Sequence, residues 1–371
     1  MIKLLGKIYI MFHVMAHVKF ALKCSPGQKI ERRSERIAII GAGPAGLGAA
    51  GYLICNGFQV DVYDKMPEPG GLMIFGIPEY RVPKKNVRNG VKELIELGVN
   101  FILKTKVVAD EEEHVDGDDF VESRVNLEDL INKYNAVLIA TGTWKSRNLG
   151  VPGENLRGVY LALDYLYRIY TSELGYLPKD VVYPTGNKVA VIGAGLTAVD
   201  AAIEAQRQGA KEVYVLYRRT INEAPAGKME IQGLIKRGIK FVELVGITEI
   251  LGKDHVEAVR LIKMKLGKPD KSGRPAPEPI PGSEYVMEMD NVIAAVGEIP
   301  TPPFRNGCCG IRLTPHGTID IDQKHRTTRK GVFAAGDVAT GPSLIGKALK
   351  NGIDAAMAIE EYLTKGGWRE S

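Results

Sequence analysis

Cysteine is scarce in this sequence, and its spacing argues against several kinds of site. The 371 residues contain only Cys24, Cys55, Cys308 and Cys309, with no C-x-x-C pair. Neither a disulfide framework nor a zinc or iron–sulfur ligand set can be assembled from them, so a reducing cytoplasm is the expected compartment. We expect Cys55 to be a core residue. Cys308 and Cys309 are adjacent and could bridge only through a strained eight-membered ring, so we expect both to be inert.

A large excess of charge of either sign is also missing. Lys and Arg number 49 against 44 Asp and Glu, and a net charge of +5 is too small for a nucleic-acid-binding protein. No nucleic acid is therefore expected as a partner. The six histidines have no metal spacing, and no metal site is expected. The acidic residues at 110–113 and 116–119 are typical of a solvated loop, although such a surface could also orient a basic partner.

The first apolar run is too short to cross a bilayer. Residues 8–16 are nine in number, and no small-residue cleavage site follows them. We expect no membrane span, and we interpret this run as an over-long start or a frayed arm. A docking segment for a partner is the alternative. Residues 24–36 are polar and basic with a Pro-Gly turn, which predicts a linker, so 1–36 is expected to be an N-terminal arm and linker.

Glycine, in contrast, is abundant, and it takes part in an internal repeat. The sequence has 42 glycines; residues 37–50 read IAIIGAGPAGLGAA and residues 189–202 read VAVIGAGLTAVDAA. Each copy is an apolar β-branched run, a glycine turn and an alanine-rich stretch. This order predicts the strand–turn–helix opening of a dinucleotide-binding unit. The chain length also suits two domains, because single cores rarely exceed about 300 residues.

Further repeated elements place the two domains along the chain. The stretches LIATG, ending at Gly142, and IAAVG, ending at Gly297, follow the two glycine turns at similar distances. A third such element, VFAAGD at 332–337, has no second copy and precedes a long helix-like stretch at 343–363. We therefore expect an α/β fold of two three-layer Rossmann-like domains, the second inserted in the first. The expected boundaries are 37–150 with 300–371 for the first domain, and 151–299 for the second.

The first glycine motif predicts a dinucleotide site. In residues 41–46, GAGPAG, the glycines allow a tight turn at Gly41, close approach of a pyrophosphate at Gly43, and helix–strand packing at Gly46. The phosphates would lie at the helix N-terminus. The next strand ends at Asp64, whose carboxylate can accept hydrogen bonds from a ribose diol. A plain turn, the alternative for one such motif, is disfavoured because the motif is duplicated.

The second motif, GAGLTA at 193–198, differs from the first in its third glycine and in the residues after the next strand. The third glycine is replaced by Ala198, which the packing role allows. Where an acidic residue would bind a ribose hydroxyl, the next strand is followed by Arg218 and Arg219. Guanidinium groups there suit a 2′-phosphate, which favours NADPH over NADH. A solvated arginine pair at a strand end is the alternative.

Two different dinucleotide sites in one chain indicate electron transfer between them, and FAD with NADPH is the economical pair. Ser343 is a plausible N-cap for the last helix. The positive end of that helix could stabilise the negative charge of a reduced flavin, so no catalytic acid or base is expected. A plain core helix is the alternative, and both interpretations can hold together.

Two further stretches resemble a known family, the small (β) subunits of glutamate synthase and their relatives. They are PGGLMIFGIP at 69–78, followed by Arg81, Pro83 and Lys84, and the run from LGKPD at 266–270 through PIPGSE at 279–284. The similarity spans about 37–363. It implies a two-dinucleotide fold like that of thioredoxin and adrenodoxin reductases, with FAD bound first and NADPH second. By the resemblance, the FAD contacts are Gly41, Gly43, Ala45, Asp64, Gly71, Leu72, Val107, Thr141, Gly142, Gly336 and Asp337. The NADPH contacts are Gly193, Gly195, Thr197, Arg218 and Arg219. We add Pro44, Gly46, Lys65, Leu196, Gly297, Leu344 and Ile345 to the expected cofactor-binding residues.

The sequence departs from this family in two places. The family's small subunits begin with a cysteine-rich domain that holds two [4Fe–4S] clusters, whereas only Cys24 precedes the first glycine motif here. Leu196 stands where the relatives usually have Asp or Asn. We expect an FAD-containing, NADPH-dependent oxidoreductase that passes electrons to an iron–sulfur protein, a ferredoxin-like carrier or a larger synthase-type subunit. A ferredoxin- or thioredoxin-type reductase and a non-catalytic flavin-binding subunit are the alternatives.

Overall fold

The computed structural model describes residues 18–109, 114–270, 273–305 and 307–368. The chain forms two units. Unit 1 contains the described residues up to Lys145 and from Ile299 onward, and unit 2 contains Ser146–Glu298. Two short strands, β7 (Lys145–Ser146) and β17 (Glu298–Ile299), lie where the chain passes from one unit to the other.

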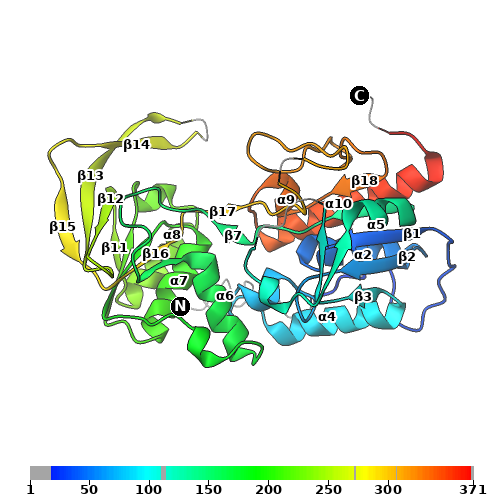
Figure 1. Cartoon of the computed structure of the whole chain (residues 1–371), viewed down its shortest axis with the longest axis horizontal. Helices are drawn as coiled ribbons and strands as arrows, with labels where there is room; N and C mark the ends of the chain where they lie inside the picture. Colours follow the sequence, from blue (N-terminus) through cyan, green and yellow to red (C-terminus); the bar gives the residue numbers. More distant parts are fainter. Residues whose placement is uncertain (1–17, 110–113, 271–272, 306, 369–371) are drawn as a thin grey trace, which may run out of the picture. The chain divides into compact units, whose positions relative to one another are not determined.

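Unit 1 is built on a parallel five-stranded sheet in the order β18-β6-β1-β2-β3 (Figure 1). Its strands β1 and β6 are almost wholly buried, because a parallel sheet covered on both faces needs apolar runs. The strand order reverses between β1 and β6, which is where ligands bind in open α/β sheets. The strands are β1 (Arg36–Ile40), β2 (Gln59–Tyr63), β3 (Asn100–Ile102), β6 (Ala136–Ile139) and β18 (Val332–Ala334).

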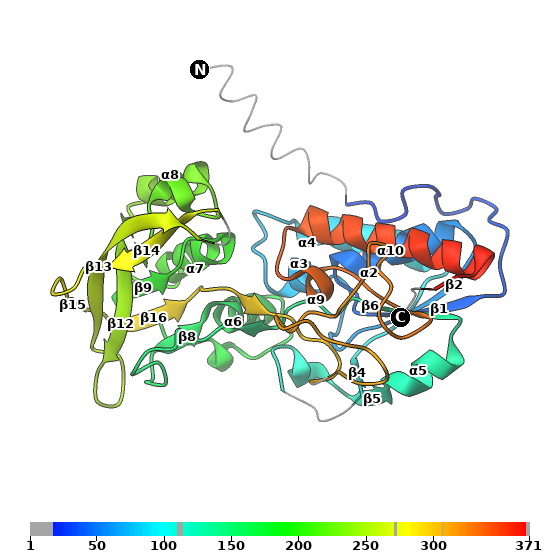
Figure 2. The same cartoon turned by 90° about the horizontal axis from the view of Figure 1, so that it is seen from above.

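The helices of unit 1 include a close pair, α2 and α10, which lie side by side in Figure 2. Glycines allow this approach, because a Cβ at Gly48 would meet the Leu349 carbonyl and one at Gly352 would meet the Ala45 carbonyl. The helices are α2 (Pro44–Cys55), α3 (Leu72–Phe75), α4 (Lys84–Leu97), α5 (Leu127–Lys133), α9 (Asp337–Thr340) and α10 (Ile345–Lys365). A 3₁₀ turn, η1 (Asp118–Phe120), and a parallel pair, β4 (Thr105–Val108) and β5 (Ser123–Asn126), complete the unit.

Unit 2 repeats this plan. Its parallel sheet has the order β11-β10-β9-β16-β8, so the strand before the second glycine motif is flanked just as β1 is. The strands are β8 (Val159–Leu161), β9 (Lys188–Ile192), β10 (Glu212–Leu216), β11 (Lys240–Val242) and β16 (Asn291–Ala294). The helices are α6 (Ala162–Glu173), α7 (Leu196–Arg207) and α8 (Lys228–Lys236), with 3₁₀ turns η2 (Lys179–Val181) and η3 (Ile221–Glu223).

A separate antiparallel sheet is added to unit 2. It is formed by β12 (Val245–Leu251), β13 (Ala258–Pro269), β14 (Pro275–Pro279) and β15 (Tyr285–Glu288), with β13 in its centre (Figure 1). The stretch at 266–270 covers the end of β13, and the stretch at 279–284 covers the end of β14 and the segment that leads to β15. This sheet is an addition to the dinucleotide-binding plan, because the parallel sheet is complete without it.

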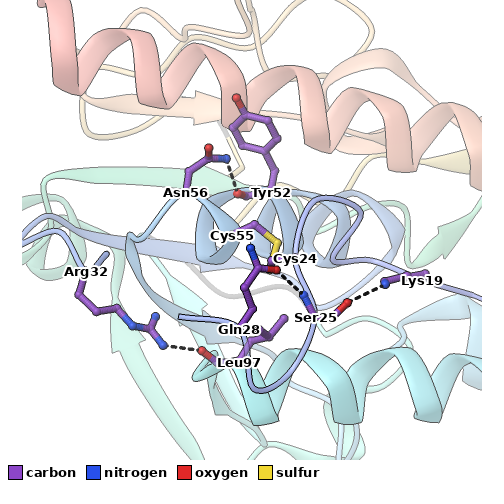
Figure 3. Close-up of a disulfide and its surroundings, with 9 residues drawn as sticks. All are labelled: Lys19, Cys24, Ser25, Gln28, Arg32, Tyr52, Cys55, Asn56 and Leu97. Atoms are coloured by element: carbon purple, nitrogen blue, oxygen red, sulfur yellow. Dashed lines mark hydrogen bonds between the residues drawn. A yellow bond between two sulfur atoms is a disulfide. The ribbon is translucent and has the colours of Figure 1, made fainter. Parts of the chain in front are cut away.

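The segment before β1 is packed against unit 1 along part of its length, although a linker is expected at 24–36. Phe20 is 2% exposed, and Cys24 forms a disulfide with Cys55 at the C-terminal end of α2 (Figure 3). Two expectations are therefore wrong: the cysteines do form a disulfide, and Cys55 is not merely a core residue. The apolar run at 8–16 lies outside the described residues, as does the acidic run at 110–113.

Candidate functional site

The first glycine motif forms a tight turn between β1 and α2. Gly41 has a φ of +107°, and a Cβ there would meet the Ala140 carbonyl, while a Cβ at Gly46 would meet the Gly41 carbonyl. These two glycines are required by the protein's own packing. Gly43 differs, because a Cβ there would meet no atom within 4 Å. The open space beside Gly43 fits a group that the chain itself does not supply.

No side chain caps the start of α2. Its N-cap is Gly43, Pro44 occupies the first helical position, and no capping hydrogen bond from a side chain is present among the described residues. The N–H groups of a first turn have no partner within the helix. Together with the positive end of the helix dipole, they suit a phosphate.

Asp64 lies just beyond β2 and faces the same turn. Its carboxylate accepts hydrogen bonds from the Ala42 N–H at 2.5 Å and the Met66 N–H at 2.8 Å. Burial raises the pKa of Asp64, while those two bonds lower it in part. Each oxygen keeps a second lone pair. The side chain can therefore still accept a hydrogen bond from a ribose hydroxyl.

Two adjoining cavities, of about 270 Å³ and about 120 Å³, lie along this edge of the sheet. Both are lined by Gly41, Asp64, Thr141 and Trp144, so they form one elongated site. Predicted residues that line one or both are Gly41, Gly43, Pro44, Ala45, Asp64, Lys65, Gly71, Leu72, Val107, Thr141, Gly142, Gly336, Asp337 and Ile345. Of the other predicted residues in unit 1, Gly46 packs beneath the turn and the Leu344 side chain is 64% exposed.

The hydroxyl of Thr141 supports a ligand in these cavities. Its Oγ1 is buried and has no hydrogen-bond partner within the described part of the chain. Leaving such a group unpaired costs about 1–3 kcal/mol. A polar group of a bound dinucleotide would remove this cost, so the residues present fit such a cofactor.

Lys65 is a wall of the larger cavity rather than a free cation. Its ammonium donates to the Asp116 carbonyl at 2.5 Å and to Asp118 at 3.0 Å, and it lies 4.6 Å from the ring centre of Trp144. Burial lowers the pKa of Lys65. Although burial alone would raise the pKa of Asp118, Lys65 and Lys106 keep it below its usual value.

The start of α10 differs from the prediction. The helix begins at Ile345 with Leu344 as N-cap, and no side chain caps it. Ser343 is therefore not the N-cap, because its hydroxyl donates instead to Asp337 at 2.7 Å. Burial raises the pKa of Asp337, and the bond from Ser343 lowers it in part. Ile345 and Ala348 line the smaller cavity, so the first turn of α10 is next to the candidate site.

Sequence reasoning missed several residues of the site. Trp144 follows the LIATG stretch by two positions, and its place after a strand end is a signal that could have been used. Residues 299–305 line the larger cavity without any recognisable pattern. The sequence predicts Ser343 only as an N-cap and Ala348 only as part of the helix-like stretch at 343–363, yet both line the smaller cavity.

In unit 2, the second glycine motif has the same geometry. Gly193 has a φ of +131° and a Cβ there would meet the Ala295 carbonyl, whereas a Cβ at Gly195 would meet nothing within 4 Å. Gly195 is the N-cap of α7, and no side chain caps the helix. Thr197 donates from its hydroxyl to Glu298 at 3.1 Å. This end of α7 is open for a second phosphate.

Two other predicted residues of unit 2, Leu196 and Gly297, lie in the helix that follows this turn and just after the strand next to β9. Leu196 is the first residue of α7 and is half-buried. Gly297 follows β16, the neighbour of β9, and has a φ of +111°. A β-branched or bulky residue would be strained at such a φ, so a glycine is required at 297.

The two arginines after β10 are not equivalent. Arg218 is exposed and has no hydrogen-bond partner among the described residues, whereas Arg219 is 3% exposed. The guanidinium of Arg219 donates to the Pro275 carbonyl at 2.7 Å and to Asp270 at 2.5 Å, both in or next to the antiparallel sheet. Only Arg218 is therefore free to meet a ligand phosphate.

Cys308 and Cys309 are free thiols with their Sγ atoms 3.1 Å apart. Burial raises the pKa of Cys309 to about 12, with smaller contributions from Cys308 and Glu128. Among the residues that the structure describes, no group of three or more His, Cys, Asp or Glu side chains could hold a metal ion. None of the described helices is both long and apolar enough to cross a membrane.

Comparison with known proteins places this geometry in a family. A model of the pyridine nucleotide-disulphide oxidoreductases matches residues 35–352. The chain belongs to this family. A putative glutamate synthase (NADPH) small chain from Cereibacter sphaeroides is 38% identical over 343 residues, which are 92% of this chain and 80% of that protein. The glutamate synthase (NADPH) small chain of Halomonas elongata is 36% identical, over 93% of this chain and 71% of that one.

Solved structures of such oxidoreductases share the fold. Mycobacterium tuberculosis FprA in complex with NADPH has a TM-score of 0.72 at 22% identity, covering 89% of this chain and 85% of that one. A thioredoxin reductase of T. acidophilum has a TM-score of 0.61 at 23% identity, covering 89% and 100%. The predicted fold of two Rossmann-like units is thus confirmed, as is the resemblance to glutamate synthase small chains. The chain is an FAD-dependent oxidoreductase that uses a pyridine nucleotide, as predicted.

Proposed function

We propose that the chain binds FAD in the joined cavities of unit 1 and NADPH at the second glycine motif of unit 2. The functional domains are then 37–150 with 300–371 for FAD and 151–299 for NADPH. The observation that carries the proposal is a pair of openings: a Cβ added at Gly43 or at Gly195 would meet no atom of the described residues within 4 Å, and each glycine lies at an uncapped helix start. A bound pyrophosphate explains both.

Residues of the chain position the cofactors, and FAD supplies the two-electron chemistry. The first turn of α2 binds the pyrophosphate, Asp64 accepts from a ribose hydroxyl, and the Thr141 hydroxyl gains its missing partner. The start of α10, whose Ile345 and Ala348 line the smaller cavity, would supply a positive field that could stabilise negative charge on a bound, reduced flavin. No side chain of the chain is needed to carry a proton in this scheme.

NADPH is the proposed donor because Arg218 is exposed at the end of β10, where a 2′-phosphate would lie. The names of the relatives agree, since both glutamate synthase small chains are described as NADPH enzymes. Arg219 contributes indirectly, because it ties the strand end to Asp270 and so fixes the loop that carries Arg218.

Electrons then leave to an acceptor on another chain. The NADPH-Fe(3+) oxidoreductase subunit beta of Geobacter sulfurreducens is 34% identical, and this chain spans 52% of its length. That relative is named as a subunit, as are the small chains of glutamate synthase. We propose an iron–sulfur protein, a ferredoxin-like carrier or a synthase-type subunit as the partner. We also propose the cytoplasm as the compartment, where NADPH and such carriers are present.

A direct test is to purify the protein, record its flavin spectrum and add NADPH without oxygen. The proposal expects a yellow protein with about one FAD per chain, whose flavin absorbance is bleached by NADPH. A yellow protein that NADPH leaves unchanged would favour a non-catalytic flavin-binding subunit. A protein that binds no FAD would overturn the proposal.

A thioredoxin-type reductase is the second candidate, and the adjacent thiols of Cys308 and Cys309 are the observation on this chain's side chains that favours it. Disulfide reduction coupled to NADPH in the wild type, and lost when both residues are replaced by serine, would establish it. We expect that the replacement changes no rate.

A further inference from the structure

Residues 18–33, here called the N-terminal strap, lie against two helices of unit 1. Phe20 is 2% exposed, and its carbonyl lies where a Cβ of Gly51 in α2 would be. The Val18 carbonyl lies in the same way against Gly90 of α4. Both helices therefore have a glycine where the backbone of the strap crosses them. The strap is packed as part of the fold in this region.

The strap is fastened by two kinds of contact, a disulfide and polar side-chain contacts; Figure 3 shows the disulfide and the contact of Arg32 with Leu97. In the middle of the strap, Cys24 is joined to Cys55, the last residue of α2. Near the end, Arg32 donates to the Leu97 carbonyl at 2.7 Å and Arg33 pairs with Glu360 at 3.0 Å. Polar side chains can exchange these last contacts with water, whereas the disulfide holds until it is reduced.

The disulfide lies next to the surface. Residues 25–29 are all exposed and form a turn, in which the Gln28 N–H donates to the Ser25 carbonyl at 3.1 Å. Cys24 is 5% exposed, but Cys55 is only half-buried. Of the two residues, Cys55 is the more exposed, and we take it as the side from which an external thiol attacks.

The helix that carries Cys55 begins at the proposed pyrophosphate site. It contains Gly46, Gly48 and Gly51, which each lower its intrinsic helical stability. Each of the three is in contact with a neighbouring backbone, from the β1 turn, α10 and the strap in that order. The helix therefore depends on these neighbours for its order, and the strap is the neighbour that a chemical reaction can release.

We propose that Cys24–Cys55 is a redox modification site, at which a dithiol reductant frees the strap and loosens the FAD-binding helix. A thiolate of the reductant attacks the Cys55 sulfur, the S–S bond breaks, and Cys24 leaves and takes up a proton. The second thiol of the reductant then attacks the mixed disulfide. The products are two protein thiols and the oxidised reductant, a transfer of two electrons and two protons.

This site is distinct from the flavin chemistry. Cys55 is eleven residues beyond Pro44 along α2, which at the helical rise is roughly 17 Å from the pyrophosphate end. The disulfide would therefore control the order of helix α2, which supports the cofactor, without taking part in the flavin chemistry. This inference rests on the proposed binding of FAD by unit 1.

The test compares oxidised and dithiothreitol-reduced wild-type protein. Alkylation of Cys24 and Cys55, detected by mass spectrometry, measures opening of the disulfide. Tryptic cleavage after the exposed Lys23 and Lys29 measures release of the strap. The amount of FAD that the protein retains on gel filtration measures cofactor binding. We expect reduction to raise the cleavage rate at least tenfold and to lower the retained FAD severalfold.

Two variants serve as controls. The C24S/C55S double variant should behave as reduced protein with or without dithiothreitol, whereas C308S/C309S should respond as the wild type does. A disulfide that dithiothreitol cannot open in the folded protein would overturn the proposal. So would reduction that leaves both cleavage and FAD retention unchanged. If the oxidised protein binds no FAD, the proposed function fails, while the cleavage assay still decides whether the strap is released.

Discussion

At the scale of the residue, Gly43 and Gly195 are glycines that the packing of the fold does not require but that binding of a pyrophosphate would. Gly43 and Gly195 have φ near −80°, and a Cβ added at either position would meet no atom within 4 Å, so neither the backbone conformation nor a clash at Cβ requires glycine there. We expect G43V to fold, with the apoprotein destabilised by about 1 kcal/mol because valine is a poorer N-cap than glycine, but to weaken FAD binding at least a hundredfold, about 3 kcal/mol or more. Titration with FAD, followed by fluorescence, measures this.

The matched control for that substitution is G195V in unit 2. It should retain FAD and raise the KM for NADPH instead. If G43V bound FAD as tightly as the wild type, the pyrophosphate would have to lie elsewhere.

We expect substitution of the two arginines after β10 to have different effects on nucleotide binding and on stability. R218A removes one charge-assisted contact, worth about 1.5–3 kcal/mol, so the KM for NADPH should rise roughly ten- to a hundredfold while that for NADH stays nearly constant. R219A removes a buried side chain that binds Asp270 and Pro275, so it should lower the melting temperature and weaken both nucleotides alike. Steady-state kinetics with each nucleotide measures the difference. Equal effects of R218A on both nucleotides would contradict the 2′-phosphate assignment.

The thiol of Cys309 predicts a dependence on pH. Its pKa is raised from 9.0 to about 12, so the neutral thiol persists through neutral pH and the thiolate forms only as the pH approaches 12. Because the thiolate is the nucleophile, iodoacetamide at pH 8 should alkylate Cys309 in the folded protein about a thousandfold more slowly than in the urea-unfolded chain. Peptide mass spectrometry after timed quenching gives both rates. Comparable rates in the two states would show that Cys309 is not shielded.

At the scale of the element, the strand–turn–helix units could be predicted because their glycines encode local backbone geometry. Gly41 and Gly193 need positive φ, and this requirement is visible in the sequence alone. Tertiary partners could not be predicted in the same way. The bond between Cys24 and Cys55 joins residues 31 apart, and Arg219 meets Asp270 across 51 residues. No local pattern marks either pair.

The packing of α10 on α2 gives a prediction of stability. A Cβ at Gly352 would overlap the Ala45 carbonyl, a backbone atom that cannot move away, so G352A should destabilise unit 1 by about 1–3 kcal/mol. G346A on the same helix is the control, because a Cβ there meets nothing within 4 Å. Alanine should stabilise the helix at that position by up to about 1 kcal/mol. Urea unfolding of the two apoproteins should move in opposite directions, and equal midpoints would contradict the packing argument.

At the scale of the whole molecule, the redox groups that the chain can hold determine how electrons can leave the flavin. Reduced flavin stores two electrons, and the described residues offer neither a metal-binding cluster nor a C-x-x-C pair to receive them. The relatives' names include subunits of larger enzymes, which agrees with an acceptor on another chain. We expect slow NADPH oxidation by the protein alone and fast oxidation with one-electron dyes, measured as loss of NADPH absorbance.

The strap changes how a docking role of the N-terminal arm, the alternative interpretation of its apolar run, must be tested. Deleting 1–36 would remove Phe20 and Cys24, which are part of unit 1, and any loss of activity could then reflect damage to the FAD site. Deleting 1–17 leaves the strap and the disulfide in place. We expect this shorter deletion to preserve FAD content and dye reduction while it weakens reduction of the co-purifying partner, because the dyes need only an accessible flavin whereas a protein partner needs a docking surface. Parallel loss of dye and partner reduction would assign the arm to the fold, and unchanged rates for both would place the docking surface elsewhere on the chain.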